Sequence, residues 1–362
     1  MFERNFYKGK KVLVTGHTGF KGTWLLGILE QLGCQVYGYS LPLEKENNFY
    51  QELYSKIERS EYGLIQDSQK VEKFVREIAP EIVIHLASHS TLDHEMKISQ
   101  YVFETNVMGV VNLLEAVRNV NSVKAVLIVT SDKCYENQES GEKYNELSKL
   151  GAQDPYSTSK ACQELVTECY RRTFFSDEKN RVRIATARAS NVIGGGDDNL
   201  SRLFPYLLDC FSSQKVATIR KRNAIRPWQN VLDVLGGYLT LIQKLYEGSD
   251  DSVCSAFNFG PEDDGFVSVG EVAEKLKTEF AGAQFACTQL DDSVIETNIL
   301  KLDNSKAKEN LGWRPMYSFD ETVKMVIEFE KRKKQEEIRD IVMDLTGRYL
   351  DMIERKFIRK NK

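Results

Sequence analysis

A tyrosine and a lysine stand four residues apart in the stretch 156–160, YSTSK. On a helix this spacing places the phenol of Tyr156 and the ammonium of Lys160 one turn apart on the same face. A nearby cation stabilises a phenolate, so that Tyr156 could take a hydroxyl proton while an acceptor takes the hydride. Tyrosine and lysine also meet at this spacing by chance on helix surfaces, so the interpretation depends on the rest of the chain.

A second reactive set follows the apolar run 125–130, which we expect to be a strand. Ser131 could complete a Ser-Tyr-Lys set, because ligands of open α/β folds bind at the carboxyl ends of strands. The adjacent acid and base, Asp132 and Lys133, go beyond what hydride transfer requires. They indicate a second proton transfer, such as the elimination of water. The alternative is a surface ion pair at a strand end.

Three glycines follow the apolar stretch 10–15 in the pattern GxxGxxG, namely Gly16, Gly19 and Gly22. From Thr23 to Leu32 apolar residues recur at helical spacing, so the glycines lie where a strand passes into a helix. There they allow a tight turn, close approach of backbone amides to a pyrophosphate, and contact between helix and strand. This context favours dinucleotide binding over a purely structural turn.

The residues after the second expected strand bear on the identity of the dinucleotide. The second expected strand, 35–39, is followed by Ser40 and Leu41, and not by the acidic residue that usually binds the ribose of NAD. Because no arginine follows to receive a 2′-phosphate, NAD is favoured over NADP. Asp67 lies at the expected end of the third strand, where it could accept from the adenine amino group or remain an exposed loop carboxylate.

Alternating patterns predict an α/β fold with a doubly wound, parallel Rossmann-type sheet. We expect helices over 71–78, 107–117 and 162–170, and strands over 82–86, 125–130 and 183–187. Residues 1–190 would form the NAD-binding domain and 191–320 a smaller α/β region that binds substrate, with chain crossings between them. Residues 321–362 would form a C-terminal helical extension, read as a solvated helix and tail or as a surface that binds a partner or a membrane.

Composition excludes several classes of function. A net charge of −4 over 362 residues provides no basic field for nucleic acid or an anionic membrane. No stretch approaches the roughly 18 apolar residues needed to cross a bilayer, so we expect a cytoplasmic protein. Seven scattered cysteines indicate reduced thiols, and the four histidines lack the partners of a metal site, so no metal is expected.

The motifs described above, with several other stretches of the chain, resemble the extended short-chain dehydrogenase/reductase family, and within it the CDP-glucose 4,6-dehydratases. The likeness is carried by residues 16–22 (GHTGFKG), 130–135 (TSDKCY), 154–160 (DPYSTSK), 191–197 (NVIGGGD), 225–229 (IRPWQ) and 301–313 (KLDNSKAKENLGW). The resemblance spans most of the chain up to about residue 320.

The resemblance implies a tightly held NAD that removes a hydride from sugar C4 and returns it to C6 after water leaves. Tyr156, helped by Lys160 and Ser131, would deprotonate the 4-hydroxyl, and the 4-ketone would acidify the C5 hydrogen. Asp132 would protonate the departing hydroxyl. Lys133 stands where related dTDP-sugar dehydratases have glutamate; as the C5 base it must be neutral, and otherwise its role is electrostatic.

Binding positions also follow from the resemblance. For the cofactor they are Gly16, Thr18, Gly19, Phe20, Lys21, Gly22, Asp67, Leu86, Ala87, Thr130, Tyr156 and Lys160. For the nucleotide sugar they are Asn191, Arg202, Arg226 and Gln229, and arginine suits phosphate oxygens, although structural salt bridges are the alternative. A homodimer that pairs helices is common in the family.

One segment departs from the family pattern. Residues 87–93 read ASHSTLD, where these dehydratases usually read AAQPLVR, so the hexose, the nucleotide or the reaction could differ. Asp198 also replaces a tryptophan often found after GGGD. One alternative is a 4-epimerase or 4-dehydrogenase, which would leave Asp132 and Lys133 without a chemical task. Another is a catalytically silent NAD-binding scaffold, against which Tyr156 and Lys160 argue.

Overall fold

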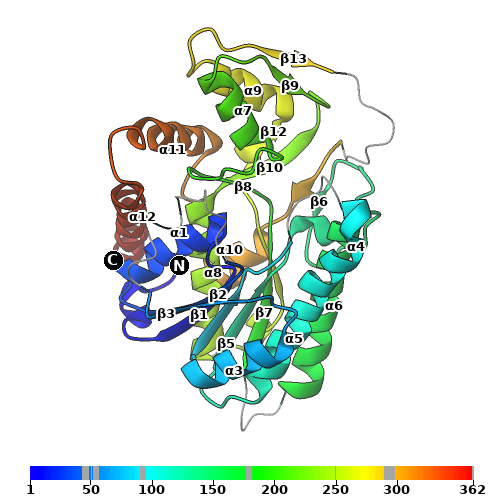
Figure 1. Cartoon of the computed structure of the whole chain (residues 1–362), viewed down its shortest axis with the longest axis vertical. Coiled ribbons are helices and arrows are strands. Elements are labelled where there is room, and N and C mark those ends of the chain that lie inside the picture. The colour runs from blue at the N-terminus through cyan, green and yellow to red at the C-terminus, as the bar shows by residue number, and fades with distance from the viewer. Residues whose placement is uncertain are drawn as a thin grey trace.

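A seven-stranded parallel sheet forms the centre of the molecule (Figure 1). The computed structural model describes residues 1–42, 49, 51, 57–89, 95–176, 182–248, 250–288 and 298–360. The strands, in chain order, are β1 (Lys11–Thr15), β2 (Gln35–Ser40), β3 (Arg59–Tyr62), β4 (Ile82–His85), β5 (Ala125–Val129), β7 (Arg183–Ala189) and β11 (Ala256–Phe259). Their spatial order is β11-β7-β5-β4-β1-β2-β3. The order in which strands are added reverses between β1 and β4, since β2 and β3 extend the sheet on one side of β1 and the later strands extend it on the other. Sheets of this kind bind ligands at that point. The predicted fold class is confirmed.

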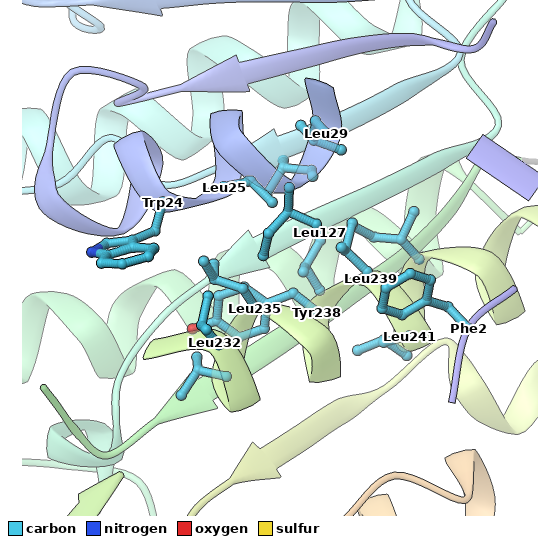
Figure 2. Packing of buried hydrophobic residues seen from close by; sticks show 14 of the residues in the cluster. Phe2, Trp24, Leu25, Leu29, Leu127, Leu232, Leu235, Tyr238, Leu239 and Leu241 are labelled. Atoms are coloured by element: carbon cyan, nitrogen blue, oxygen red, sulfur yellow. The ribbon is translucent and has the colours of Figure 1, made fainter. Parts of the chain in front are cut away.

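Helices cover both faces of this sheet because its strands alternate their side chains between two apolar layers. Leu13 of β1 and Ile128 of β5 pack into one layer with the helices α3 (Ser68–Ile78) and α5 (Gly109–Arg118). Val12 and Leu127 point into the other layer, with α1 (Phe20–Gln31) and α8 (Val231–Glu247). Figure 2 shows side chains from α1, β5 and α8 in this second layer.

Three further helical elements lie on the side of the first layer. They are α4 (Glu95–Phe103), the π-helical turn η3 (Glu104–Met108) and α6 (Pro155–Phe174). Helix α6 begins seven residues before the predicted Cys162, since Asp154 caps it and proline suits the first turn of a helix. Short 3₁₀ turns are η1 (Arg4–Tyr7), η4 (Asp132–Cys134), η6 (Asp251–Val253) and η7 (Asp263–Gly265).

A smaller region lies beyond the carboxyl ends of the strands (Figure 1). It contains the sheet β12-β10-β8 and the pair β13-β9, formed by β8 (Asn191–Ile193), β9 (Ala217–Ile219), β10 (Ile225–Asn230), β12 (Phe266–Ser268) and β13 (Phe285–Cys287). The helices α7 (Leu203–Ser212), α9 (Val269–Lys277) and α11 (Phe319–Arg332) share its core with these strands. Between its parts the chain returns to the main sheet through α8 and β11, so the region is not one continuous segment. A pair of two-residue strands, β6 (Lys143–Tyr144) and β14 (Lys301–Leu302), and α10 (Ser305–Leu311) complete the elements before the C-terminal helices.

The C-terminal extension differs from a solvated helix, which was one of the interpretations left open by the sequence. It is divided into α11 and α12 (Ile338–Lys360), which are separated by a turn. Helix α12 packs against α1, where a Cβ on Gly27 would lie 2.8 Å from the Cγ1 of Val342. Leu345 and Tyr349 of the same helix are buried in the main core cluster. The inner face of α12 is therefore part of the main core. Among the described residues, no helix has the length and apolar character needed to span a membrane.

Candidate active site

One cavity of about 1810 Å³ lies where the main sheet meets the smaller region. Its walls come from both: the glycine turn after β1 on one side, and residues such as Phe204 and Arg226 on the other. Ordinary small-molecule sites occupy about 300–1,000 Å³. The cavity is thus large enough to hold two ligands at once.

The turn between β1 and α1 leaves room that only glycine permits. Gly16 has φ +71°, and a Cβ on it would lie 2.6 Å from the backbone nitrogen of Ala87. A Cβ on Gly22 would lie 2.4 Å from the carbonyl oxygen of Gly16. No side chain caps the first turn of α1, so its backbone N–H groups and its positive dipole end are available to an anion. The turn therefore fits a diphosphate.

Tyr156 and Lys160 lie on the first turns of α6, and both line the cavity. The Nζ of Lys160 is 5.8 Å from the centroid of the Tyr156 ring. It donates to the carbonyl oxygen of Val129 at 3.4 Å and to the Oε1 of Gln163 at 3.0 Å. Burial, followed by the charge of Lys21, lowers the pKa of Lys160 to about 7. Its charge therefore responds to small changes around it near neutral pH.

The segment after β5 brings an acid to the same cavity. Ser131 caps the short turn η4: its Oγ accepts from the backbone N–H of Lys133 at 3.2 Å and donates to the Oδ1 of Asp132 at 3.1 Å. Asp132 is buried, and its Oδ2 has no hydrogen-bond partner among the described residues. Burial raises the pKa of Asp132, although Lys133 and Ser131 oppose this. The carboxyl group can thus hold a proton and give it up to a ligand.

A buried ion pair that the sequence analysis missed lies behind these groups. Glu164 of α6 and Arg188 of β7 meet at 2.9 Å. Glu164 also accepts from the hydroxyl groups of Thr130, at 2.5 Å, and Thr186, at 2.7 Å, while Arg188 donates to the OH of Tyr135 at 2.8 Å. The pair ties the helix that carries Tyr156 to the strand end that carries Asp132. The position of Glu164, four residues after Lys160, was the available signal.

Asn106 is a second residue that the sequence analysis missed. Its Oδ1 accepts from the backbone N–H of His89 at 2.8 Å, and its Nδ2 donates to the Oγ of Ser159 at 2.8 Å. Its carbonyl oxygen accepts from Gln163 at 2.7 Å, since Asn106 lies in the π-helical turn η3. These bonds join the loop after β4 to the first turns of α6. No pattern in the sequence predicts a π-helical turn.

Most of the predicted site residues line the one cavity. They are Gly16, Thr18, Gly19, Phe20, Lys21, Gly22, Leu86, Ala87, Thr130, Ser131, Asp132, Lys133, Tyr156, Lys160, Asn191, Arg202 and Arg226. Arg202 lies next to the Asp197 carboxylate, with Nη1 at 3.0 and 2.9 Å from its two oxygens. Arg226 is buried and donates to the carbonyl oxygens of Ile225 and Asn298 at 3.0 and 3.3 Å.

Two predicted residues do not line the cavity. β3 ends at Tyr62, so Asp67 lies beyond the strand, where its Oδ1 accepts from the backbone N–H of Lys70 at 3.0 Å and caps α3. The cavity wall there is formed by Ile65 and Gln66. Gln229 points into the protein, and its Nε2 donates to the carbonyl oxygen of Phe259 at 2.7 Å. Neither residue lines the cavity, so this structure gives no support to these two ligand-binding assignments.

The segment that departs from the family pattern is only partly described. Ser88 and His89 line the cavity, and the His89 ring packs edge-on against Tyr101 with centroids 5.8 Å apart. Residues 90–94 lie outside the described residues. In the parts of the chain that the structure describes, no three His, Cys, Asp or Glu side chains are grouped to hold a metal.

Comparison with known proteins identifies the family. The family model described as GDP-mannose 4,6 dehydratase matches residues 13–326. The chain belongs to this family. A CDP-glucose 4,6-dehydratase of Salmonella typhimurium is 40% identical over 338 residues, which cover 91% of this chain and 93% of that protein. The expected family relationship is confirmed.

Two solved structures of other enzymes share the fold of this chain. The dTDP-glucose 4,6-dehydratase DesIV of Streptomyces venezuelae, solved with NAD and TYD bound, has a TM-score of 0.76 at 21% identity, covering 91% of this chain and 99% of that one. A UDP-glucose 4-epimerase of Thermotoga maritima, solved with UDP-glucose, has a TM-score of 0.76 at 21% identity, with coverage of 90% and 100%. Because a dehydratase and an epimerase fit equally well, the fold alone does not separate the two reactions.

Proposed function

We propose that this protein uses NAD to convert CDP-glucose into CDP-4-keto-6-deoxyglucose. The proposal rests on one observation. Four side chains line the same cavity, namely Tyr156, Lys160, Asp132 and Lys133. The relative that is 40% identical is a CDP-glucose 4,6-dehydratase, which supports this substrate. A 4-epimerase or 4-dehydrogenase would need the first two residues and would have no use for the second two.

The residues of the glycine turn fit the dinucleotide. Gly16 and Gly22 leave the space that its diphosphate needs, and Ser40 and Leu41 provide no arginine for the 2′-phosphate of NADP. When bound, NAD takes the hydride from sugar C4 and returns it to C6. Tyr156 accepts the proton of the 4-hydroxyl, and the charged form of Lys160 stabilises the phenolate. Ser131, which is already bonded to Asp132, orients the same hydroxyl group.

The elimination needs a base at C5 and an acid at C6. In its neutral form Lys133 takes the C5 proton, the C6–O bond breaks, and Asp132 gives its proton to the departing hydroxyl, so that water leaves. Burial raises the pKa of Asp132, which favours the protonated form that this step needs. Hydride returned to C6 and a proton returned to C5 then give the 4-keto-6-deoxy sugar, with no net oxidation.

The smaller region is proposed to hold the nucleotide. Asn191, Arg202 and Arg226 line the cavity there and would contact the diphosphate. In this proposal residues 1–190 bind NAD, residues 191–320 contribute the substrate wall while returning part of their length to the main sheet, and residues 321–362 support α1. The Arg202 contact with Asp197 would orient its guanidinium group.

We further propose a cytoplasmic homodimer that pairs η3 and α6 with their copies. Met108 and Leu165 are large apolar residues that are 47% and 61% exposed on these elements. Light scattering on the purified protein should give twice the chain mass, and Leu165→Glu should reduce it to one chain mass. The seven free cysteines suit the reducing cytosol, which cell fractionation would test.

The experiment that tests the function uses a panel of CDP-, dTDP-, GDP- and UDP-hexoses with the purified protein and NAD. Mass spectrometry should show loss of one water from CDP-glucose, and alkaline solution should develop the absorbance of the enone. No loss of water from any member of the panel would rule out dehydration. Lys133→Met should oxidise C4 without elimination, whereas Lys73→Met, on the exposed face of α3, should behave as wild type.

A further inference from the structure

The ammonium of Lys160 is held by a neutral amide. The Oε1 of Gln163 accepts from its Nζ at 3.0 Å, the shorter of the two hydrogen bonds that this ammonium makes with described residues. Lys160 and Gln163 are 3% and 0% exposed. Lys160 lines the cavity, whereas Gln163 is not among the described residues that do so. Gln163 therefore lies behind Lys160 and acts on the reaction only through it.

The other end of this amide is anchored in a different element. The Nε2 of Gln163 donates to the carbonyl oxygen of Asn106 at 2.7 Å, in the π-helical turn η3. The opposite orientation of the amide would set its NH₂ group against the ammonium and its oxygen against this carbonyl oxygen. The two neighbours thus select one orientation, in which the oxygen faces Lys160. Asn106 also donates to the Oγ of Ser159 at 2.8 Å, so η3 is fixed to the first turns of α6.

The charged and titratable groups around Lys160 come from four elements. Burial lowers the pKa of Lys160 to about 7, Lys21 of α1 adds to this effect, and Cys134 of η4 and Glu164 of α6 oppose it. His85, at the end of β4, is buried as well, and the charge of Lys160 adds to the burial that lowers its pKa. Glu164 is already paired with an arginine of β7. Among the described residues, the acceptors bonded to the ammonium are the amide and one backbone carbonyl.

We propose that Gln163 is a positioning residue that holds the ammonium of Lys160 beside the ring of Tyr156, with its amide anchored on Asn106. The proposal rests on the proposed function, which gives Lys160 its task. An acceptor stabilises the charged form of a lysine, so the amide favours the ammonium that supports the phenolate. A carboxylate in its place would fix the charge more firmly, whereas a neutral amide lets the charge respond to ligands. An ammonium has three N–H donors, so two bonds to the protein leave one for a ligand.

The test measures the titration of Lys160 directly, by NMR of the NAD-loaded enzyme labelled with ¹³C at the lysine ε-carbons. The signal of Lys160 is the one that Lys160→Met removes. A hydrogen bond to a charged group shifts a pKa by about one to two units, so Gln163→Met should lower the titration midpoint by about this amount. Gln163→Glu keeps the shape of the side chain and places an anion beside the ammonium, so it should raise the midpoint.

Gln243→Met is the matched control for the loss of a buried amide. Gln243 lies on α8, and both ends of its amide are bonded. Its Oε1 accepts from the backbone N–H of Glu3 at 2.7 Å, and its Nε2 donates to Glu247 at 2.6 Å. This variant should leave the midpoint of Lys160 unchanged.

The pH dependence of turnover separates positioning of the charge from a structural role. Turnover of CDP-glucose by Gln163→Met should fall about 10- to 100-fold above the wild-type midpoint, in proportion to the shift. It should approach the wild-type value below the lowered midpoint, where Lys160 is charged in both proteins. A loss of the same size at every pH, with an unchanged midpoint, would overturn the inference and leave Gln163 a structural residue.

Two outcomes decide between this inference and the proposed function. If Gln163→Met does not fold, Gln163→Glu is the deciding variant, and a midpoint that does not rise would overturn the inference. If the midpoints shift as expected while the wild type removes water from no nucleotide sugar, Gln163 does hold the charge of Lys160 and the proposed function is wrong instead.

Discussion

The ammonium of Lys160 lies 5.8 Å from the ring centroid of Tyr156 and is bonded to the carbonyl oxygen of Val129, the last residue of β5. One lysine thus connects the helix that carries the phenol with the strand that leads to Asp132. Because the same cation contacts both elements, a change in its charge or position affects both halves of the proposed reaction.

Removing the phenolic oxygen should stop the first step. Tyr156→Phe deletes the group that accepts the 4-hydroxyl proton, and general base catalysis contributes about 10²–10⁴-fold. Turnover of CDP-glucose should fall by about this factor, while NAD stays bound after purification. Tyr170→Phe is the matched control, because Tyr170 lies on the same helix and donates to Glu115 away from the cavity. A Tyr156→Phe enzyme with more than a tenth of wild-type turnover would exclude Tyr156 as the base.

Asp132→Asn should separate oxidation from elimination. Asparagine keeps the shape of the side chain and cannot deliver a proton, so C4 oxidation should persist while water loss slows about 10²–10⁴-fold. In rapid-mixing experiments the absorbance of the reduced nicotinamide should build up in the variant.

The pH dependence provides a second test of Asp132. The acid form exists below the raised pKa of Asp132, so the wild-type elimination rate should decline as pH rises through that value. The variant should lack this decline. Unchanged elimination in Asp132→Asn would assign the acid to another group.

The buried ammonium of Lys160, which the proposed reaction needs, should lower the free energy of unfolding. In the folded protein its pKa is about 7, against 10.5 as the ordinary value. Between these two values the unfolded chain binds more protons, so stability rises with pH across this window, and the cost is largest below pH 7. In the ligand-free protein Lys160→Met should therefore raise the free energy of unfolding by roughly 1–3 kcal/mol at pH 6 and by much less at pH 10.

Urea denaturation at both pH values measures this difference. Lys73→Met should show no dependence of this kind, since Lys73 is exposed. A Lys160→Met variant that is less stable than wild type at pH 6 would mean that the lost hydrogen bonds outweigh the burial of the charge.

The buried pair of Glu164 and Arg188 should be the most sensitive part of the scaffold. Glu164→Gln leaves an unpaired guanidinium in the interior, which costs about 3–5 kcal/mol. Glu168→Gln, one turn further along α6, breaks only partly exposed ion pairs and should cost less than about 1 kcal/mol. Chemical denaturation compares the two. Similar losses in the free energy of unfolding for both variants would show that the buried pair stabilises the fold no more than the partly exposed pairs do.

The fold followed from local patterns because each of its parts has a short-range cause. The glycine turn, the apolar runs of β1, β4 and β5, and the Tyr156–Lys160 spacing all act within a few residues. Their alternation sets the order of strands and helices, and the parallel sheet then brings the ends of β4 and β5 to one edge. The placement of Ser131 and Asp132 beside Tyr156 follows from this edge.

What could not be predicted depends on contacts between distant segments. Asp67 was misplaced because β3 ends at Tyr62, and the length of a short strand is set by its partner β2. Gln229 faces Phe259 because β10 leads into the core helix α8. The hydrogen bond from Asn106 to Ser159 joins residues 53 positions apart along the chain, and no local pattern reports such a pair.

In the proposed reaction, C4 is oxidised, water is eliminated and C6 is reduced on the same sugar within one cavity. The most direct measurement supplies CDP-glucose with deuterium at C4 to the NAD-loaded protein in ordinary water, followed by mass spectrometry and NMR of the product. The account predicts a product that has lost one water and carries the deuterium at C6. A product that keeps deuterium at C4, or a 4-keto sugar that retains its 6-hydroxyl, would contradict it.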